Sequence, residues 1–390
     1  MTPPRLARIP LLSLKRQHAR IGSELRRAVL RVLDSGVFIL GPEVKRFEAE
    51  FAAALGARHA VGVSSGTAAL SIALEAVGVG QDDEVVLPSF SFVATATAVS
   101  ALGARPVFAD IDPATMTLDP AAAARAVTRR TKALIPVHLF GQPADMDALL
   151  ALARKKGLQV VEDCAQAHLT AYKGRMAGVI GDAGAFSFYP SKNLGAAGDA
   201  GAVTVPDAAL AEACRQLRNC GRETGAPAYR HVRVAQNCRL DEIQAAVLRV
   251  KLRHLAEWTA RRRDAALRYI AGLQGLPIIL PDPGNSGTSH SFHLFVVRCG
   301  RRDELARHLT QRGIGNAVYY PIPIHRQPAY QARAPRPAAL PQTDEAARTA
   351  LALPMYPELG EREIAAVCRA VREFFKCARR LRRRATAAPI

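Results

Sequence analysis

The sequence lacks several features that mark common classes of protein. No run of apolar residues reaches the roughly 18 positions that a membrane-spanning helix needs. The opening residues 1–5 include one arginine, but the apolar core and small-residue cleavage site of a secretory signal do not follow them. These absences favour a globular protein of the cytoplasm and give no reason to expect a membrane partner.

Paired cysteine motifs are also absent. The seven cysteines are scattered along the chain and include no Cys-x-x-Cys pair. We therefore expect reduced thiols rather than a disulfide framework or a zinc site, and no metal is predicted. The sequence has neither a Walker loop nor a Gly-x-Gly-x-x-Gly fingerprint, so ATP and NAD are not favoured as ligands.

Basic residues, in contrast, are abundant. The chain has 53 Lys and Arg against 34 Asp and Glu, which gives a formal net charge of +19. Much of this excess is spread along the chain, and the densest cluster is the tail from Lys376 to Arg384. Such a tail is typical of a solvated end, and contact with an anion or a polynucleotide stays open as the alternative. A positive potential would also attract a substrate that carries phosphates.

Residues 58–205 alternate short β-branched runs with Ala- and Leu-rich helical stretches. This alternation is typical of a parallel sheet whose strands are connected by crossover helices. One such helix is predicted over 145–156, where Asp145 is a good N-cap. We therefore expect an α/β protein with a large, mostly parallel, seven-stranded sheet flanked by helices. The predicted strands are 60–63, 84–87, 106–109, 133–137, 159–162, 184–188 and 201–205.

The remainder of the chain predicts a smaller α+β domain at the C-terminal end. A long helix from Leu240 to about Tyr269 is expected to bridge the domains, with residues 1–255 in the large domain and 256–390 in the small one. A proline-rich loop is predicted over 321–341, and long irregular segments are often functional. The other elements expected in the small domain are a strand over 291–297 and helices over 302–312 and 361–375.

A first candidate site is the stretch from Val63 to Leu70, where a strand end, a Ser/Gly turn and a helix start follow one another. Free backbone NH groups and the positive end of the helix dipole make such a turn a seat for phosphate. Gly66 would let the backbone approach closely, and Thr67 would add a hydroxyl donor. An ordinary helix N-cap is the alternative interpretation of the same residues.

A second candidate is Asp163, which ends a predicted buried strand at the carboxyl edge of the sheet, where ligands of such folds usually bind. A buried acid there needs a partner. A pyridinium nitrogen would supply one, because a carboxylate beside it keeps the ring protonated and able to accept electrons. The alternative is a carboxylate that caps the next helix.

A third candidate is Lys192, in a turn that follows a strand and is surrounded by aromatic and small residues. Desolvation lowers the pKa of an ammonium group and favours a neutral amine, which can form a Schiff base and later move a proton. A lysine after a strand can equally be an ordinary surface residue.

The order of these three features is typical of pyridoxal-phosphate enzymes of fold type I. From about Leu14 to Arg372 the chain resembles the DegT family of nucleotide-sugar aminotransferases. Further stretches that carry the resemblance are Leu33 to Gly36, Ile39 to Val44, Pro136 to Asp145, Arg239 to Ala246 and Leu353 to Pro357.

The resemblance implies a set of contacts with pyridoxal 5'-phosphate. Lys192 would hold the cofactor as a Schiff base, and Asp163 would protonate its pyridine nitrogen. The other implied contacts are stacking on the ring by Phe92, a hydrogen bond to the phenolic oxygen from Gln166, and phosphate binding by Gly66, Thr67 and Ser187.

The resemblance also implies a homodimer with shared active sites. Asn237, which precedes the Arg-Leu-Asp stretch, would reach the phosphate of the cofactor in the neighbouring subunit. From the sequence pattern alone, Asn237 is better interpreted as a plain helix N-cap.

The implied reaction is transamination in two halves, from an amino donor such as glutamate to a 3-keto or 4-keto nucleotide sugar, with a slight preference for the 3-keto type. Lys192 would move the proton in each half. The residues expected to face the sugar are His168, Tyr320 and His325, and each could equally be packed or solvent-facing. Competing hypotheses are another reaction of the same fold, such as a dehydratase, and a basic nucleic-acid-binding regulator. Dehydratases of the family carry histidine in place of the cofactor lysine, so Lys192 speaks against that branch.

Overall fold

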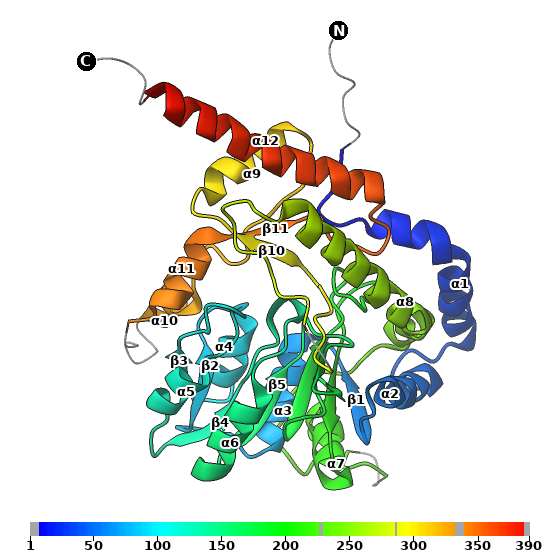
Figure 1. Cartoon of the computed structure of the whole chain (residues 1–390). Coiled ribbons are helices and arrows are strands. Elements are labelled where there is room, and N and C mark those ends of the chain that lie inside the picture. The colour runs from blue at the N-terminus through cyan, green and yellow to red at the C-terminus, as the bar shows by residue number, and fades with distance from the viewer. Residues whose placement is uncertain (1–7, 226–228, 285–286, 332–338, 386–390) are drawn as a thin grey trace.

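The computed structural model shows a large sheet-containing part and a smaller part above it (Figure 1). It describes residues 8–225, 229–284, 287–331 and 339–385, with side chains described up to residue 376. Among the described helices, none is both long and apolar enough to cross a membrane.

A sheet of seven strands, in the order β1-β9-β8-β5-β4-β2-β3, forms the centre of the large part. β9 runs antiparallel to its neighbours β1 and β8, and the pairs from β8 to β3 are parallel. The mostly parallel, seven-stranded sheet predicted from the alternating pattern is therefore confirmed. The strand bounds are β1 His59–Val63, β2 Glu84–Pro88, β3 Arg105–Ala109, β4 Thr131–Leu134, β5 Gln159–Asp163, β8 Ala183–Ser187 and β9 Gly201–Val205.

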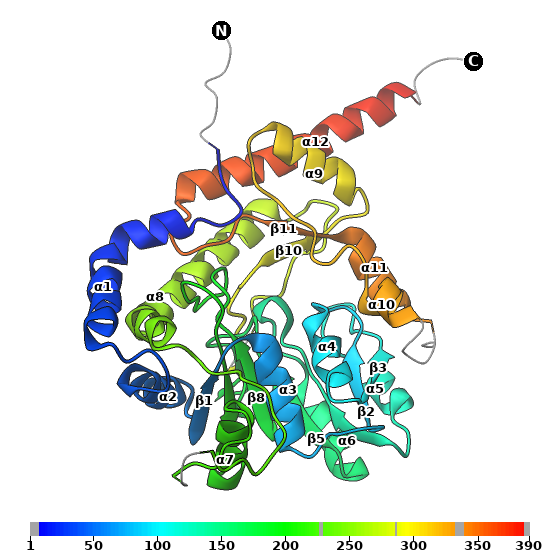
Figure 2. The ribbon, with the colours of Figure 1, turned by 180° about the vertical axis from the view of Figure 1, so that it is seen from behind.

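Helices cover both faces of this sheet because successive side chains of a strand point to opposite faces. Within β2, Val85 and Leu87 pack in one core cluster and Val86 packs in another. Figure 2 shows α3 on the face that is seen from behind. That face also carries α4 and α7. The opposite face carries α5, α6 and, nearer β8 and β9, α2 and the long helix α8 (Glu242–Leu273). The bounds of the flanking helices are α2 Pro42–Leu55, α3 Gly66–Ala76, α4 Ala94–Ser100, α5 Pro120–Ala126, α6 Met146–Lys156 and α7 Ala208–Leu217.

The predicted helix over 145–156 is confirmed, since α6 begins after Asp145, whose side chain accepts a hydrogen bond from the Ala148 NH. The strand predicted over 133–137 is shifted, because β4 ends at Leu134 and the chain then turns toward the cavity. Three short elements lie beside the sheet: η1 Leu139–Gly141, β6 Ala171–Tyr172 and β7 Arg175–Met176.

The small part is built on a two-stranded antiparallel sheet of β10 and β11. The strand predicted over 291–297 is wrong at its start, because β10 begins only at Phe295. The chain leaves the extended region at Phe292, where φ is 45°, so residues 291–294 cannot continue the strand. The bounds of the small-part elements are β10 Phe295–Arg298, α9 Arg302–Gln311, α11 Pro341–Thr349, β11 Ala350–Leu353 and α12 Glu361–Ala385.

Two predicted segments of the C-terminal region differ from the structure. The helix predicted over 361–375 continues to Ala385 as α12, so the basic tail is helical in its backbone, and its side chains from residue 377 on lie outside the described part. The loop predicted over 321–341 contains two short helices, η2 (Ile324–Arg326) and α10 (Pro328–Gln331), and its residues 332–338 lie outside the description.

Two segments connect the large and small parts. The predicted bridging helix is present as α8 (Glu242–Leu273), which packs against α1 (Leu14–Ser35), α2 and α12. The N-terminal strand-like segment joins the small part, because the Ile9 NH donates to the Gly313 carbonyl at 3.0 Å and Ile9 is buried in the small core. A boundary at 255/256 falls inside α8, so the continuous helix shows no break there.

Candidate active site

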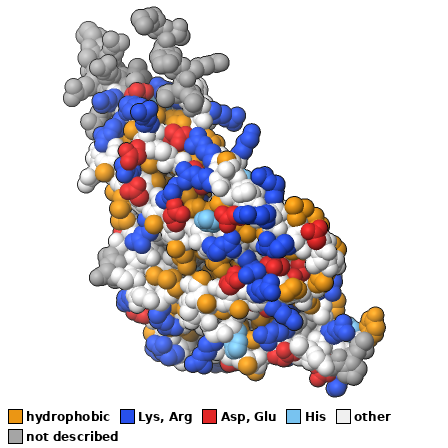
Figure 3. Space-filling view, turned by 90° about the vertical axis from the view of Figure 1, so that its right-hand side faces the viewer, with side chains coloured by type: hydrophobic (Ala, Val, Ile, Leu, Met, Phe, Trp, Pro, Cys, Tyr) orange, Lys and Arg blue, Asp and Glu red, His pale blue; other side chains and the backbone are white. Residues whose placement is uncertain are grey.

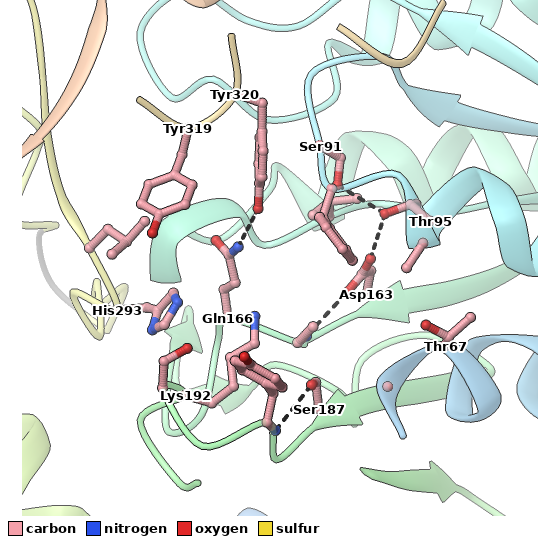
Figure 4. A pocket seen from close by; sticks show the side chains of 18 of the residues that line it. Thr67, Ser91, Thr95, Asp163, Gln166, Ser187, Lys192, His293, Tyr319 and Tyr320 are labelled. Carbon is pink, nitrogen blue, oxygen red and sulfur yellow. Dashed lines mark hydrogen bonds between the residues drawn. The ribbon is translucent and has the colours of Figure 1, made fainter. Parts of the chain in front are cut away.

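A cavity of about 580 Å³ lies where the carboxyl edge of the sheet meets the small part (Figure 4). Its floor comes from the ends of β5 and β8 and from the first turn of α3. Its walls come from the segment after β2, from Leu11 and Leu12, and from residues 293–294 and 319–320 of the small part. The position agrees with the general rule that ligands of open α/β sheets bind outside the carboxyl ends of the strands.

Asp163 ends β5 and projects into this cavity. Its side chain accepts hydrogen bonds from the Thr95 hydroxyl at 2.9 Å and from the Ala165 NH at 3.1 Å. Burial raises the pKa of the Asp163 carboxyl, while these two hydrogen bonds and the charge of Lys192 oppose the rise. A buried carboxylate of this kind is stabilised when a cationic partner enters beside it.

Lys192 lies in the turn that follows β8. The turn closes tightly: the Lys192 NH donates to the Tyr189 carbonyl at 2.8 Å, and a Cβ on Gly195 would lie 2.3 Å from the Pro190 oxygen. Burial lowers the pKa of the Lys192 ammonium to about 8, against the opposing effect of Asp163. A substantial fraction of the amine is therefore neutral near physiological pH, which nucleophilic attack on an aldehyde requires.

The first turn of α3 forms a small polar cradle opposite the end of β8. Ser65 caps the helix by accepting a hydrogen bond from the Ala68 NH at 3.1 Å. Gly66 packs so closely on β8 that a Cβ would lie 2.6 Å from the Ser187 Cβ. The Thr67 and Ser187 side chains line the same cradle, so hydroxyls and the positive helix end are available to an anion.

Phe92 and Gln166 lie in the wall between these groups. Phe92 is 55% exposed despite its apolar ring, as expected of a side chain that packs against a ligand. The Gln166 amide is held at both ends, because its oxygen accepts from the Phe140 NH at 2.7 Å and its nitrogen donates to the Tyr320 hydroxyl at 2.9 Å. Tyr320 therefore lines the cavity, and its contact with the sugar stays a prediction.

His168 does not reach the cavity, contrary to its expected role on the sugar side. Its side chain is completely buried beneath the sheet edge, with its ring centroid 5.7 Å from that of Phe186 and 5.6 Å from that of Phe188. Burial lowers the pKa of His168 to about 3, so the ring is neutral. A side chain without exposed surface cannot contact a sugar, and His168 is a core residue.

His325 also lies outside the cavity wall. Its Nδ1 pairs with the Ser89 hydroxyl at 2.7 Å, its backbone NH donates to the same hydroxyl at 3.1 Å, and its Nε2 lies 3.8 Å from Asp344. These contacts fasten the segment that carries Tyr320 to the end of β2. The His325 ring therefore lies behind the cavity wall and does not face the cavity.

Asn237 is exposed and lies away from the cavity of its own subunit. Its backbone pairs with Asn219 in an isolated bridge. The N-cap interpretation is wrong, since α8 begins at Glu242 after Asp241. The expected contact with a neighbouring subunit stays a prediction.

Among the polar residues of the cavity that the sequence patterns did not identify are Thr95, His293 and Tyr319. Thr95 lies in the first turn of α4, three residues after Phe92. Tyr319 precedes Tyr320 but gave no signal of its own. His293 was assigned to a strand, and only the break at Phe292 brings it to the cavity.

The side chains of the cavity fit an aromatic aldehyde that carries a ring nitrogen and a phosphate. Lys192 offers the amine for the aldehyde, Asp163 the carboxylate for a protonated ring nitrogen, and Gly66 a cradle that any larger residue would fill. Pyridoxal phosphate has these three features.

Comparisons with known proteins agree with this arrangement. The model of the DegT/DnrJ/EryC1/StrS aminotransferase family matches residues 19–372. The chain is 48% identical to a dTDP-3-amino-3,4,6-trideoxy-alpha-D-glucose transaminase of Streptomyces venezuelae, over 94% of this chain and 96% of the relative. It is 44% identical to a UDP-N-acetyl-3-dehydro-alpha-D-glucosamine 3-aminotransferase of Acidithiobacillus ferrooxidans, over 93% and 97%.

A solved structure gives the same result in three dimensions. The crystal structure of S. venezuelae DesV in complex with a ketimine intermediate superposes with a TM-score of 0.91 and 49% identity, covering 94% of this chain and 98% of the other. Family model, relatives and structure each span nearly the whole chain. The chain therefore belongs to the DegT/DnrJ/EryC1/StrS aminotransferase family.

Proposed function

We propose that this chain is a pyridoxal-phosphate-dependent transaminase that moves an amino group from an amino acid to a keto nucleotide sugar. The proposal rests on three groups that line one cavity: the partly buried Lys192 amine, the buried Asp163 carboxylate and the cradle at Gly66. Each of the three matches one part of the cofactor, and they come from three separate segments: the end of β5, the turn after β8 and the start of α3.

When bound, the cofactor supplies an aldehyde for covalent attachment and a ring that accepts electrons from the substrate carbon. Asp163 would keep the ring nitrogen protonated, and the Thr95 hydroxyl holds that carboxylate in place. Lys192 would hold the aldehyde and would serve as the group that moves a proton in each half-reaction. Phe92 would lie against the ring, and Gln166 would bind its phenolic oxygen.

The acceptor that we propose is a nucleoside-diphosphate 3-keto sugar. The names of the two relatives described above both place the amino group at carbon 3. The small part supplies the sugar-facing wall through Tyr319 and Tyr320. A net charge of +19 favours the approach of a substrate that carries a diphosphate.

We further propose glutamate as the amino donor and a homodimer as the active form. Large apolar side chains are exposed beyond the end of α1, at Val37, Phe38 and Ile39, each 43–44% exposed. A cluster of this kind is typical of a surface that another chain covers. Asn237, on the surface, would then serve the phosphate cradle of the neighbouring subunit.

A cytoplasmic location is part of the proposal. The six cysteines that the structure describes are free thiols, which a reducing compartment would keep in that state.

The nucleic-acid-binding alternative gains no clear support from the face shown in Figure 3. Lys and Arg side chains are numerous on this face, but Asp, Glu and apolar side chains lie among them. Several arginines are already paired, as where Arg249 contacts both Glu43 and Glu50. The basic tail can be tested separately, since a polynucleotide contact would be salt-dependent and lost on removal of residues after Phe375.

The experiment that tests the proposal is a pair of half-reactions. Purified holoenzyme is mixed with glutamate, and the absorbance of the lysine-bound cofactor should disappear in proportion to enzyme. A panel of 3-keto and 4-keto nucleotide sugars is then added, and a 3-keto sugar should restore that absorbance and yield an amino sugar. Restoration by 4-keto sugars alone would correct the regiochemistry. If glutamate and other amino acids leave the absorbance unchanged, the chain is not a transaminase.

A further inference from the structure

We propose that Asn193 and His293 form a positioning pair through which the small part of the molecule holds the Lys192 turn in place. The inference goes beyond the transamination itself. It rests on the position of Lys192 in the cavity and is independent of which sugar or amino donor the enzyme uses.

Asn193 connects the two parts directly. It follows Lys192 in the chain, and only 2% of its surface is exposed. Its Nδ2 donates to the Ser291 carbonyl at 3.1 Å, and its Oδ1 lies 3.2 Å from the His293 Nδ1. Both partners belong to the irregular segment 291–294 that leads into β10. The turn that carries the reactive lysine is thus tied to the small part by the next residue.

The hydrogen-bonding pattern fixes the state of the His293 ring. Because the Asn193 Nδ2 already donates to a carbonyl, its Oδ1 is left as an acceptor, so the His293 Nδ1 must carry the proton. Burial lowers the pKa of His293 well below its usual value, which keeps the ring neutral. The other nitrogen, Nε2, is then unprotonated. His293 lines the same cavity as Lys192 (Figure 4).

The segment that holds Asn193 is itself anchored to the long helix. Arg262 of α8 is 3% exposed, and its Nη1 donates to the carbonyls of Phe292, His293 and Met355 at 3.2–3.3 Å. The Thr170 hydroxyl also bonds to Ser291 at 2.8 Å. Because contacts on both sides restrain the segment 291–294, it can hold the lysine turn in a defined position. A loop without such contacts could not do so.

The exposure of Lys192 to water should therefore depend on the Asn193–His293 pair. The charged or titratable groups around Lys192 and His293 are Asp163 from β5, His168, Arg262 from α8 and His290. None of these contacts Asn193 through a hydrogen bond in the described part of the chain. Loss of the pair lets the turn move and admits water beside Lys192, which reduces the desolvation that lowers its pKa.

The test measures the pH dependence of the reactivity of the Lys192 amine in the cofactor-free protein. The rate at which an amine-specific acylating reagent labels Lys192, read by peptide mapping, is followed against pH. We expect Asn193→Ala and His293→Ala each to raise the midpoint of this curve by about one pH unit. The double variant should show no larger shift than either single one, because a pair that acts as a unit is not additive. In the holoenzyme the same variants should shift the pH titration of the cofactor absorbance.

Two further variants separate positioning from simple loss of stability. His293→Asn keeps an NH for the Asn193 oxygen and should restore the wild-type midpoint. Asn316→Ala removes comparable amide contacts, to the Ala306 and Ile314 carbonyls, at a residue that does not line the cavity, and should leave the midpoint unchanged. If Asn193→Ala does not fold, His293→Ala and His293→Asn give the same comparison. Unshifted midpoints in the folded variants, or additive shifts in the double variant, would overturn the proposal; failure of the half-reactions alone would not.

Discussion

At the scale of single residues, burial acts in opposite directions on the two charged groups of the cavity. It lowers the pKa of Lys192 and raises that of Asp163, and each charge partly offsets the effect on the other. Both shifts favour the neutral forms in the cofactor-free protein. A cationic ring nitrogen beside Asp163 supplies the partner that the carboxylate lacks, so binding of the cofactor and ionisation of Asp163 reinforce each other.

The lowered pKa of Lys192 predicts a pH-dependent stability. The folded pKa is about 8 and the unfolded value is 10.5, so below pH 8 folding carries the full cost of burying a charge. Between pH 8 and 10.5 only the unfolded chain holds the proton, and stability rises with pH. Cofactor-free Lys192→Met should therefore unfold with a free energy higher than wild type by on the order of 3 kcal/mol at pH 7. Denaturant titrations should show this difference shrinking above pH 8; a constant difference would contradict the assigned pKa.

Asp163→Asn should retain the cofactor, because Lys192 still binds the aldehyde, but an amide cannot stabilise a protonated ring nitrogen. We expect the half-reaction with glutamate to slow by about 100-fold or more in single-turnover measurements. Thr95→Val removes only the hydrogen bond that holds the carboxylate and should slow it by about tenfold. An Asp163→Asn enzyme as fast as wild type would remove the proposed role of this carboxylate.

Local patterns could predict Lys192, Asp163 and Gly66 as site residues, because the residues next to each of them in the sequence indicate its structural setting. A strand end, a glycine before a helix and an aromatic-Pro-Ser-Lys turn are visible without tertiary information. His168 and His325 could not be resolved in this way. Whether a side chain after a strand faces a cavity or the core depends on packing from distant elements, here Phe186, Phe188 and Ser89.

At the scale of elements, the end of β2 and the segment around η2 are coupled through one residue, Ser89. The Ser89 side chain contacts both the ring and the backbone NH of His325, and its carbonyl accepts from the Ile324 NH at 2.9 Å. Tyr319 and Tyr320 lie a few residues before this anchor. The position of the sugar-facing wall therefore depends on a contact outside the cavity.

Ser89→Ala should loosen that wall without touching Lys192 or Asp163. We expect the KM for the keto sugar to rise by roughly three- to tenfold, with a smaller effect on the glutamate half-reaction. Steady-state kinetics with each substrate varied in turn would measure the difference. Ser71→Ala, a serine of α3 whose hydroxyl contacts the Ala98 carbonyl, is a matched control and should change neither value. Equal effects on both substrates would argue against a sugar-side role.

Most strands of the sheet could be predicted because they are short runs with β-branched residues, bounded by turn residues; β8, with the sequence AGAFS, contains none. The strand over 291–297 could not, since its apolar residues fit a strand and only the positive φ of Phe292 interrupts it. That backbone change is supported by tertiary contacts, including the bond from the Arg262 Nη1 to the Phe292 carbonyl at 3.2 Å. Propensity along the chain does not report such contacts.

At the scale of the whole molecule, the cavity is assembled from parts that are distant in sequence. Leu11 and Leu12 line it from the N-terminal segment, and the Leu11 carbonyl accepts from the Met355 NH at 3.1 Å. Ile9 is buried in the small core. The predicted domain boundary at residue 255 does not describe this arrangement, because a segment at the start of the chain packs against residues near its end.

The proposed dimer predicts complementation between two impaired variants. If Asn237 serves the cradle of the neighbouring subunit, each active site takes its Lys192 from one subunit and its Asn237 from the other. Lys192→Ala and Asn237→Asp in separate chains therefore fall together in one site and leave the second site of the mixed dimer unchanged. A mixed dimer would then contain one intact site, so co-refolding equal amounts should recover roughly a quarter of wild-type activity. Lys192→Ala mixed with Asp163→Asn is the control and should recover none, since both residues come from the same subunit. Without recovery in the first mixture, the site is not shared through Asn237.

The central claim is that Lys192 binds the cofactor. The most direct test is to reduce the holoenzyme with borohydride, digest it and map the peptide that carries the cofactor. Only a neutral amine inside the cavity can form the bond that borohydride makes permanent. The structure predicts a single labelled peptide, with the cofactor on Lys192, and no label in Lys192→Ala. A label on any other lysine, or none at all, would contradict the central claim.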